Sequence, residues 1–329
     1  MTLLTRRTAL AGTAAVAAAA VTSGMRLAVA AAPPAGKQAP SVYRYRIGSF
    51  EVTAVSDGGR VVPLADSFVR NAKKDEVNTA LEAAFLEKDK FPFVFTPLVV
   101  NTGKQLVVID TGNGRGALQQ SGGTAGQFHD NLAAAGIDPK TVDAVIISHF
   151  HGDHIGGLLD AENKLAFPNA EVLVPAPEWA FWMDDGNMNR APEAARGGFA
   201  NARRVFDAFG RKVTQYEAGK EVVPGITAIA THGHTPGHMS HRVADGNASV
   251  IVQGDVSNLP ALFVRNPGWH AMFDMDPQMA EAARRKLYDQ VVADRTLLQG
   301  YHFPFPAHGH LEKDGQGYRL VPAQWSTVL

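Results

Sequence analysis

Short apolar segments recur along this chain after its first 40 residues, and their periodicity predicts a mixture of strands and helices. Runs of about four to eight residues that are continuously apolar, or that alternate with polar residues, are typical of strands. They predict strands near residues 42–48, 50–56, 96–101, 105–110, 142–147, 171–174, 224–230 and 249–253. Apolar residues spaced as on one helix face predict helices near residues 77–87, 125–135, 177–185, 199–209 and 277–293. Groups of strands with helices between them indicate an α/β fold with a two-layer core.

A dense cluster of metal-binding residue types follows one of the predicted strands. His149, His151, Asp153 and His154 stand within six positions, in a chain that has no cysteine. In an extended segment, side chains two positions apart leave the backbone on the same side, which suits His149 and His151 for one ion. Asp153 and His154 are adjacent and must diverge, so they could bind a second ion. We expect the segment from Ser148 to Asp153 to be a loop that carries ligands for two metals.

Three later segments place a histidine or an aspartate just after a strand-like run. Open α/β sheets collect functional groups at such strand ends. These residues are His234, Asp255 and His302. His308 and His310 lie close behind His302 in the sequence, and either of them could replace it as a ligand.

The order and spacing of these blocks resemble the metallo-β-lactamase superfamily of metallohydrolases. The matching motifs are HxHxDH at 149–154, GHTPGH at 233–238, GD at 254–255 and an upstream IDTG at 109–112. A narrower resemblance, to the family of methyl parathion hydrolase and related exported lactonases and aryl esterases, comes from the segments at 45–58, 165–170 and 317–322. The resemblance implies an αββα sandwich with two mixed sheets flanked by helices, and one catalytic domain over residues 41–329.

The resemblance also implies the ligands of two divalent metal ions. One ion would be bound by His149, His151, His234 and His302, the other by Asp153 and His154, with Asp255 bridging both. Zinc is the expected metal, and manganese, cobalt and iron are alternatives that mixed nitrogen and oxygen ligands also admit. Asp110 is expected to support the metal loop without binding a metal. No ligand position of the family matches His232, His238 or His241, which we expect in a supporting layer or at the surface.

This ligand set predicts hydrolysis by a metal-activated nucleophile. Five neutral imidazoles and two carboxylates leave two divalent cations with a net charge of about plus two. That charge favours a metal-bridging hydroxide as the nucleophile near neutral pH. Asp153 and Asp255 are the candidate catalytic residues, and Asp153 is also a candidate proton carrier.

The substrate class is narrowed by one ligand. β-Lactamases usually lack the bridging carboxylate, so Asp255 favours lactones, aryl esters or organophosphate triesters over β-lactams. One alternative is a quorum-quenching lactonase that acts on N-acyl homoserine lactones. The other is a non-hydrolytic metal-binding or redox protein of the flavodiiron type. Such proteins usually carry an acidic ligand at the position of His151, which disfavours the second alternative.

Aromatic residues are candidates for the wall of an apolar substrate pocket. Residues 258–276 are rich in proline, glycine and aromatic residues and follow Asp255 closely, so they predict a loop over the metals. The residues expected to contact the substrate are Trp179, Phe263 and Phe273.

The first 30 residues resemble a twin-arginine signal peptide, which predicts export to the periplasm or the medium. Arg6 and Arg7 precede an Ala/Val-rich stretch, and Ala28–Ala30 fits a cleavage site, with residues 31–40 as a linker. Arg26 interrupts the apolar run, so we expect cleavage and no stable membrane insertion.

The charge balance disfavours a nucleic-acid partner. The formal net charge is −1, and it becomes −4 without the first 30 residues, which contain three arginines and no acidic residue. Nucleic-acid-binding proteins usually present a basic face. We therefore expect a small-molecule substrate, and the sequence leaves a homodimer open.

Overall fold

Two seven-stranded sheets dominate the computed structural model of this chain, which describes residues 34–210 and 212–329. Residues Pro40–Leu329 form one compact unit. The expected signal peptide over residues 1–30 lies outside the described residues and stays a prediction. No helix in the described part of the chain is long and apolar enough to span a bilayer.

The first sheet is mixed. Its strands, in spatial order, are β1 (Val42–Ile47), β2 (Phe50–Val55), β5 (Leu98–Asn101), β6 (Leu106–Ile109), β7 (Ala144–Ile146), β8 (Glu171–Pro175) and β9 (Thr214–Tyr216). The strands β6 to β9 pair in parallel, whereas β1, β2, β5 and β6 pair antiparallel.

The second sheet is also mixed, with one parallel pair, β13 with β14. Its strands, in spatial order, are β10 (Glu221–Val223), β11 (Ile226–Ala230), β12 (Met239–Asp245), β13 (Ala248–Val252), β14 (Leu297–Gln299), β15 (His308–Asp314) and β16 (Gly317–Pro322). A separate hairpin pairs β3 (Gly59–Pro63) with β4 (Lys90–Val94).

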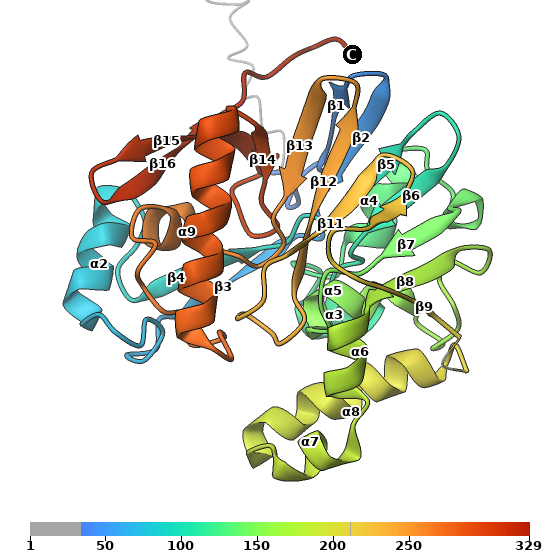
Figure 1. Cartoon of the computed structure of the whole chain (residues 1–329), viewed down its shortest axis with the longest axis horizontal. Helices are drawn as coiled ribbons and strands as arrows, with labels where there is room; N and C mark the ends of the chain where they lie inside the picture. Colours follow the sequence, from blue (N-terminus) through green and yellow to red (C-terminus); the bar gives the residue numbers. More distant parts are fainter. Residues whose placement is uncertain (1–33, 211) are drawn as a thin grey trace, which may run out of the picture. The chain divides into compact units, whose positions relative to one another are not determined.

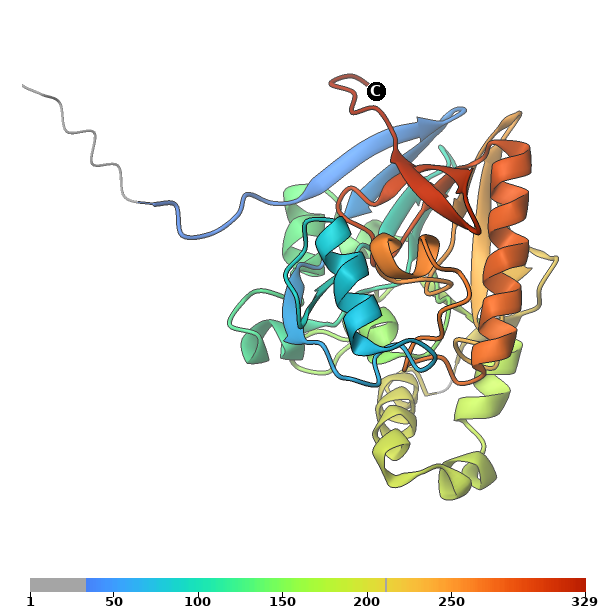
Figure 2. The same ribbon diagram turned by 90° about the vertical axis from the view of Figure 1, so that its left-hand side faces the viewer.

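Helices connect and cover the strands (Figure 1). The α-helices are α2 (Lys74–Ala83), α3 (Arg115–Gln120), α4 (Phe128–Ala134), α5 (Gly152–Ile155), α6 (Ala176–Trp182), α7 (Asp185–Arg190), α8 (Glu193–Asp207) and α9 (Pro277–Asp294). Two short 3₁₀ helices, Pro139–Thr141 and Gly156–Leu158, and a π-helix, Pro260–Val264, complete the elements of the residues that the structure describes. Figure 2 shows α2 beside the π-helix.

The longest helix, α9, has recognisable boundaries in the sequence. The Asp276 side chain accepts a hydrogen bond from the backbone N–H of Met279 at 2.9 Å, which is the usual role of an N-cap aspartate. Pro277 occupies the first turn, where its missing N–H costs nothing. The helix ends at Asp294, and the next residue, Arg295, has a left-handed φ of 52°.

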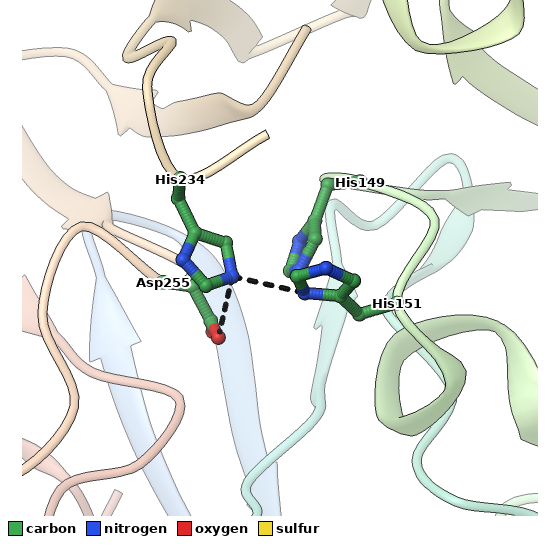
Figure 3. A group of neighbouring side chains, drawn as sticks. All are labelled: His149, His151, His234 and Asp255. Carbon is green, nitrogen blue, oxygen red and sulfur yellow. Dashed lines mark hydrogen bonds and ion pairs between the residues drawn. The ribbon is translucent and has the colours of Figure 1, made fainter. Parts of the chain in front are cut away.

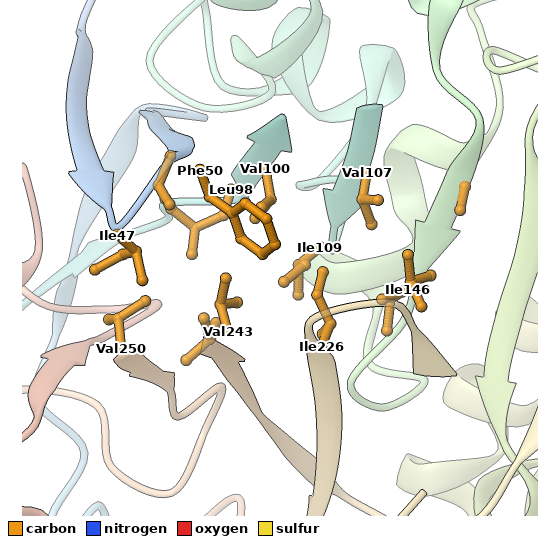
Figure 4. Close-up of a cluster of buried hydrophobic side chains, with 14 of the residues drawn as sticks. Ile47, Phe50, Leu98, Val100, Val107, Ile109, Ile146, Ile226, Val243 and Val250 are labelled. Atoms are coloured by element: carbon orange, nitrogen blue, oxygen red, sulfur yellow. The ribbon is translucent and has the colours of Figure 1, made fainter. Parts of the chain in front are cut away.

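The main hydrophobic core lies between the two sheets (Figure 4). Alternation along β6 shows how the sequence builds it: Val107 and Ile109 face the second sheet, while Val108 faces the helices on the outer side. From the second sheet, Ile226 and Val243 pack against them. Because successive strand residues point to opposite faces, continuous apolar strands can be buried on both sides.

Each outer face has its own core. Side chains of α4, α6 and α8 cover the first sheet, with Phe128, Trp182 and Phe199 among the buried residues. Leu287 and Val291 of α9 cover the second sheet. The layers are therefore helix, sheet, sheet, helix, which confirms the expected αββα sandwich.

All eight strands expected from the sequence are present, with boundaries within two residues. The strands that the pattern missed include β12 and β15, whose sequences MSHRVAD and HGHLEKD are strongly polar. Pairing with both neighbours in the second sheet holds these segments extended. That stabilisation comes from distant strands and leaves little signal in local hydrophobicity.

Candidate metal centre

The candidate ligands lie where four strands end. Within the second sheet, β11 and β13 both pair antiparallel with β12, and β13 runs parallel to β14. The carboxyl ends of β11, β13 and β14 therefore lie at one edge of the sheet. His234, Asp255 and His302 follow these three ends, and the segment His149–His154 follows β7 of the first sheet.

The first group of side chains, His149, His151, His234 and Asp255, is shown in Figure 3. One ligand atom from each lies within 4.8 Å of the others. The Nδ1 atom of His151 is 3.0 Å from Nε2 of His149 and 3.0 Å from Nε2 of His234. Nε2 of His234 is 3.3 Å from Oδ2 of Asp255. Three ring nitrogens thus converge on one small volume beside a carboxylate.

The second group contains Asp153, His154 and His302. Oδ2 of Asp153 is 3.7 Å from Nε2 of His154 and 3.7 Å from Nε2 of His302. The expected division of ligands was therefore wrong for His302, which lies with Asp153 and His154 and not with His149 and His151. The sequence could not show which group His302 joins, because that depends on how the two sheets pack against each other.

Asp255 lies between the two groups. Its Oδ1 is 3.2 Å from Nε2 of His154, and its Oδ2 is 3.0 Å from Nε2 of His302 and 3.3 Å from Nε2 of His234. One carboxylate therefore faces ligand atoms of both groups, as the expected bridging role requires.

His302 is favoured as a ligand over the two histidines that follow it. His308 and His310 belong to β15. The His308 ring stacks on Tyr45 with the ring centroids 4.5 Å apart, and His310 is exposed. Neither residue belongs to the two groups of candidate ligands among the described residues.

The backbone of the ligand segment departs from the expected loop. Residues from Ser148 to His151 are irregular, but Gly152 begins the short helix α5, which carries Asp153 and His154. The backbone N–H groups of His154 and Ile155 donate to the carbonyl of His151 at 3.0 and 3.2 Å. Because of this helical turn, the side chains of Asp153 and His154 leave the backbone in a different direction from those of His149 and His151.

The geometry fits a pair of metal cations. Nε2 of His154 and Oδ1 of Asp255 are buried 3.2 Å from each other, and neither makes a well-formed hydrogen bond among the described residues. Poorly satisfied buried polar atoms cost free energy, and a cation coordinated by both atoms would remove that cost. Five imidazoles and two carboxylates form a donor set that suits divalent transition metals.

Asp110 supports the first-sheet half of the site, as expected. It is buried, with a left-handed φ of 58°. Its Oδ1 accepts the backbone N–H of Ser148 at 2.8 Å, and its Oδ2 lies 2.8 Å from Nδ1 of His154 and accepts the Ser148 hydroxyl at 2.7 Å. A carboxylate on Nδ1 orients the ring so that Nε2 faces the metal site.

Asp274 supports the second-sheet half in the same way. Its Oδ1 is 3.0 Å from Nδ1 of His234, and its Oδ2 is 3.4 Å from Nη2 of the buried Arg284. The sequence interpretation missed Asp274. The signal was its place in residues 258–276, which were expected to pass over the metals.

Glu178 joins the two ligand loops and was also missed. This fully buried carboxylate accepts the backbone N–H of Phe150 at 3.1 Å and of Gly237 at 2.7 Å. It also accepts the indole N–H of Trp182 at 2.6 Å. One acidic residue inside the apolar segment APEWAFW is the sequence signal for such a buried role.

His238 and His241 are fully buried, in agreement with a supporting layer and not with the surface. Nε2 of His238 accepts the backbone N–H of Asp255 at 2.9 Å, which fixes the start of the bridging segment. Gly254 has a φ of 59°, and a Cβ atom there would lie 2.7 Å from that His238 nitrogen. Only glycine fits this position without rearrangement.

Burial and the nearby carboxylates act in opposite directions on the pKa values of the ligand histidines. Burial, followed by the charge of His234, lowers the pKa of His151 to about 3, so this imidazole is neutral and can donate its lone pair. Burial opposes a charge on His234 too, but hydrogen bonds to Asp255 and Asp274 raise its pKa to about 9. The carboxylates thus draw protons onto ligand rings, and metal binding would displace those protons.

A cavity of about 510 Å³ opens onto both groups of ligands. Its wall includes Phe93, Phe95, Phe273, Arg60 and Asn258. A second, more apolar cavity of about 760 Å³ shares His151 and Phe273 with the first. It is lined by Phe181, Trp182, Phe199 and Met272.

Only one of the three expected substrate contacts lies in these cavities. Phe273 lines both of them. Trp179 instead packs in the core of the first sheet against Phe150 and Phe206. Phe263 belongs to the π-helix, is 0% exposed and packs in a buried cluster with Phe68 and Phe91. Residue type alone could not separate core aromatics from cavity aromatics, so the expectations for Trp179 and Phe263 are corrected.

The comparison with known families agrees with this geometry. The metallo-beta-lactamase superfamily model matches residues 94–299, more than half of the chain. The chain therefore belongs to this superfamily and is a metal-dependent hydrolase.

Individual relatives extend the comparison. The chain is 24% identical over 241 residues to an N-acyl homoserine lactonase from a Bacillus species, covering 68% of this chain and 84% of that protein. The solved structure of AidC, a dizinc quorum-quenching lactonase, superposes with a TM-score of 0.81 at 24% identity, over 88% of this chain and 99% of AidC. AbOPH, a hydrolase in the beta-lactamase superfamily, gives a TM-score of 0.80 at 26% identity over 88% of this chain and 100% of AbOPH. The narrower resemblance to methyl parathion hydrolase stays a prediction.

Proposed function

We propose that this chain is an exported dinuclear metallohydrolase that opens lactones and cleaves aryl esters, with N-acyl homoserine lactones as the favoured class. The observation that carries the proposal is the position of Asp255, whose two oxygens face the two groups of candidate ligands. The lactonase relatives support the substrate class.

The ligand residues define what the bound metals would supply. Two divalent cations would activate a water molecule as hydroxide and polarise the carbonyl oxygen of the substrate. Asp110 and Asp274 hold the rings of His154 and His234 in the orientation that binding needs. Asp255 holds the two groups at a fixed separation.

Asp153 is the ligand best placed to move a proton. Its side chain is 23% exposed, while the side chain of Asp255 is 5% exposed. It lines the cavity that opens onto both groups. Its Oδ2 could accept the proton of the attacking water and return it to the leaving oxygen.

The cavities support a substrate with one reacting carbonyl and an apolar chain. The 510 Å³ cavity contains the ligand atoms, whereas the 760 Å³ cavity next to it is lined mainly by apolar side chains. A lactone ring with an acyl chain would place the scissile bond in the first cavity and the chain in the second. An aryl ester would use the same aromatic wall.

One panel of measurements tests this proposal. The purified full chain is analysed for bound metal and assayed with a six-carbon N-acyl homoserine lactone, phenyl acetate and a methyl phosphotriester. We expect two metals per chain and the highest kcat/KM with the lactone. Fewer than one metal per chain, or no hydrolysis of lactone or ester, contradicts the proposal, and the highest rate on the phosphotriester would assign the chain to organophosphate hydrolysis.

Export is tested separately. The chain is expressed with and without residues 1–30 in a bacterium with a twin-arginine pathway, and cell fractions are compared. We expect the full chain in the periplasm, with loss of export when Arg6 and Arg7 are both replaced by lysine. Equal cytoplasmic retention of all forms would contradict export.

A further inference from the structure

One buried amide in the wall of the metal cavity has no partner. Asn258 is 3% exposed and lines the same cavity as Asp153, Asp255 and His302. Its side chain makes no hydrogen bond with any of the described residues. The two polar atoms of this carboxamide are not fully enclosed, so they face the cavity and can hydrogen-bond a molecule inside it.

The two other asparagines of this cavity, Asn113 and Asn201, are less buried and each has a hydrogen bond within the protein. The Asn113 amide donates to Asp57 at 2.9 Å. The Asn201 carbonyl accepts from Arg204 at 3.0 Å, and Arg204 also donates to Asn163 at 2.7 Å. Asn258 differs from them because it is buried and its carboxamide is available to a ligand.

The backbone that carries Asn258 is fixed on every side. The N–H of Asp255 donates to His238 at 2.9 Å, and the carbonyl of Val256 accepts from Arg284 at 2.7 Å. The carbonyl of Ser257 accepts from Gln253 at 3.1 Å. After Asn258, the carbonyl of Leu259 accepts from the first turn of the π-helix. The backbone position from which the amide extends is therefore fixed before a ligand arrives, as the support of a specificity-determining group should be.

The surroundings of Asn258 indicate the chemistry of its ligand. Phe93, Phe95 and Phe273 offer no hydrogen bonds, and the second cavity beyond Phe273 is mainly apolar. A carboxamide presents both N–H donors and a carbonyl acceptor. A secondary amide in the substrate presents the same two groups and is their complement.

We propose that Asn258 is a specificity-determining residue that hydrogen-bonds an acylamino group next to the scissile carbonyl of the substrate. The apolar chain of that group would extend into the cavity lined by Phe181, Trp182 and Phe199. This inference rests on the proposed lactone and ester hydrolysis and narrows it to substrates that carry an amide beside the reacting bond. A site that hydrogen-bonds a polar group discriminates strongly against analogues that lack it.

The test compares two lactones of equal length. One is the six-carbon N-acyl homoserine lactone, and the other is a γ-butyrolactone that carries an alkyl chain in place of the acylamino group. We expect the wild-type chain to prefer the first by about 10- to 100-fold in kcat/KM. Asn258→Leu keeps the approximate volume and removes both hydrogen-bonding groups, so it should abolish most of this preference by slowing only the acylamino substrate.

Two further variants and one binding measurement complete the test. Asn258→Asp keeps an acceptor and removes the donor, so it should lose part of the preference. Asn169→Leu is the matched surface control, because Asn169 is exposed and bonded only to the carbonyl of Lys140. It should keep both rates within about twofold, below the discrimination of one hydrogen bond. Binding of the ring-opened acylamino acid, measured by calorimetry, should weaken about tenfold in Asn258→Leu at unchanged metal content.

The outcomes separate the two proposals. An equal loss on both lactones, or an unchanged preference in Asn258→Leu, overturns the role of Asn258 while leaving lactone hydrolysis intact. A wild-type chain that opens neither lactone overturns the proposed function. In that case, equal affinity of wild type and Asn258→Leu for the acylamino acid also overturns the role of Asn258.

Discussion

The two sheets contribute to the metal centre in different ways. The first sheet supplies four candidate ligands from a single segment, His149–His154, whereas the second supplies His234, Asp255 and His302 from three separate strand ends. The positions of the four ligands from the first sheet depend on the local backbone geometry of one segment. The positions of the three ligands from the second sheet depend on sheet register and packing, because three strands must end at the same edge.

The supports of the two halves are both distant in sequence, and they differ most at His302. On the first sheet, Asp110 follows β6 and binds Ser148 and His154, which are 38 and 44 residues away in the sequence. On the second sheet, His234 is oriented by Asp274, at a similar separation of 40 residues. His302 is held by the carbonyl of Val94, 208 residues away, at 2.8 Å from its Nδ1. We expect the second half to be the more sensitive to distant substitutions.

Replacing Asp255 should have the largest effect, because its carboxylate faces ligand atoms of both groups. Asp255→Ala should lower kcat/KM by about 10³-fold or more, since several kcal/mol of metal-based stabilisation are lost and each 1.4 kcal/mol is tenfold. It should also reduce metal content below two per chain. Steady-state kinetics and elemental analysis measure both effects, and full activity without this carboxylate would refute its role.

His302→Ala should remove one of two metals and leave the first group, His149, His151 and His234, able to bind the other. The expected loss of activity is about 10²-fold or more, because one Lewis acid is missing. His310→Ala is the matched control on the exposed face of β15 and should retain both metals. Loss of metal from His310→Ala with retention in His302→Ala would reverse the assignment.

Asp110→Asn and Asp274→Asn compare the supports of the two halves. Each removes a carboxylate from a ligand ring, and such changes typically cost about 10- to 100-fold in metal affinity. Asp274→Asn should weaken only the ion bound by His149, His151 and His234. Competition with a chelator measures the two affinities, and uniform weakening of both ions by Asp274→Asn would show that the halves are not separate.

Glu178→Gln tests the link between the halves. Glutamine cannot accept all three hydrogen bonds that Glu178 accepts from Phe150, Gly237 and Trp182. We expect a loss of about 3 kcal/mol in the free energy of unfolding, because hydrogen bonds to a buried charge are the strong ones. Denaturant unfolding of metal-free and metal-loaded protein measures it. A change below about 0.5 kcal/mol, the usual effect of a surface substitution, would show that Glu178 is not a structural link.

His241 should give the smallest effect, visible in the pH dependence of stability. Burial lowers its pKa from 6.5 to about 4 in the folded chain, so its contribution is complete above pH 6.5 and is lost as the pH falls toward 4. At pH 5 the loss should be about 1–2 kcal/mol relative to neutral pH. His241→Phe should flatten this decline in chemical unfolding measured between pH 7 and 5. An unchanged slope would show that another group titrates.

The sequence determined those parts that depend on neighbours along the chain. The spacing of His149, His151, Asp153 and His154 is local, and the apolar periodicity of strands such as β6 and β7 set their burial. Family motifs added His234, Asp255 and His302, which the structure brings together with the first four residues. From these the αββα fold and the seven candidate ligands could be predicted.

Only the tertiary structure decided which distant groups meet. In the structure, His302 lies with Asp153 and His154. Trp179 and Phe263 are packed in the hydrophobic core, and Asp274 contacts His234. The tertiary structure also left Asn258 buried without a partner beside the candidate ligands. These outcomes depend on how two sheets pack and where their strands end, and no local pattern contains that information, because contacts between distant residues are fixed by the whole fold.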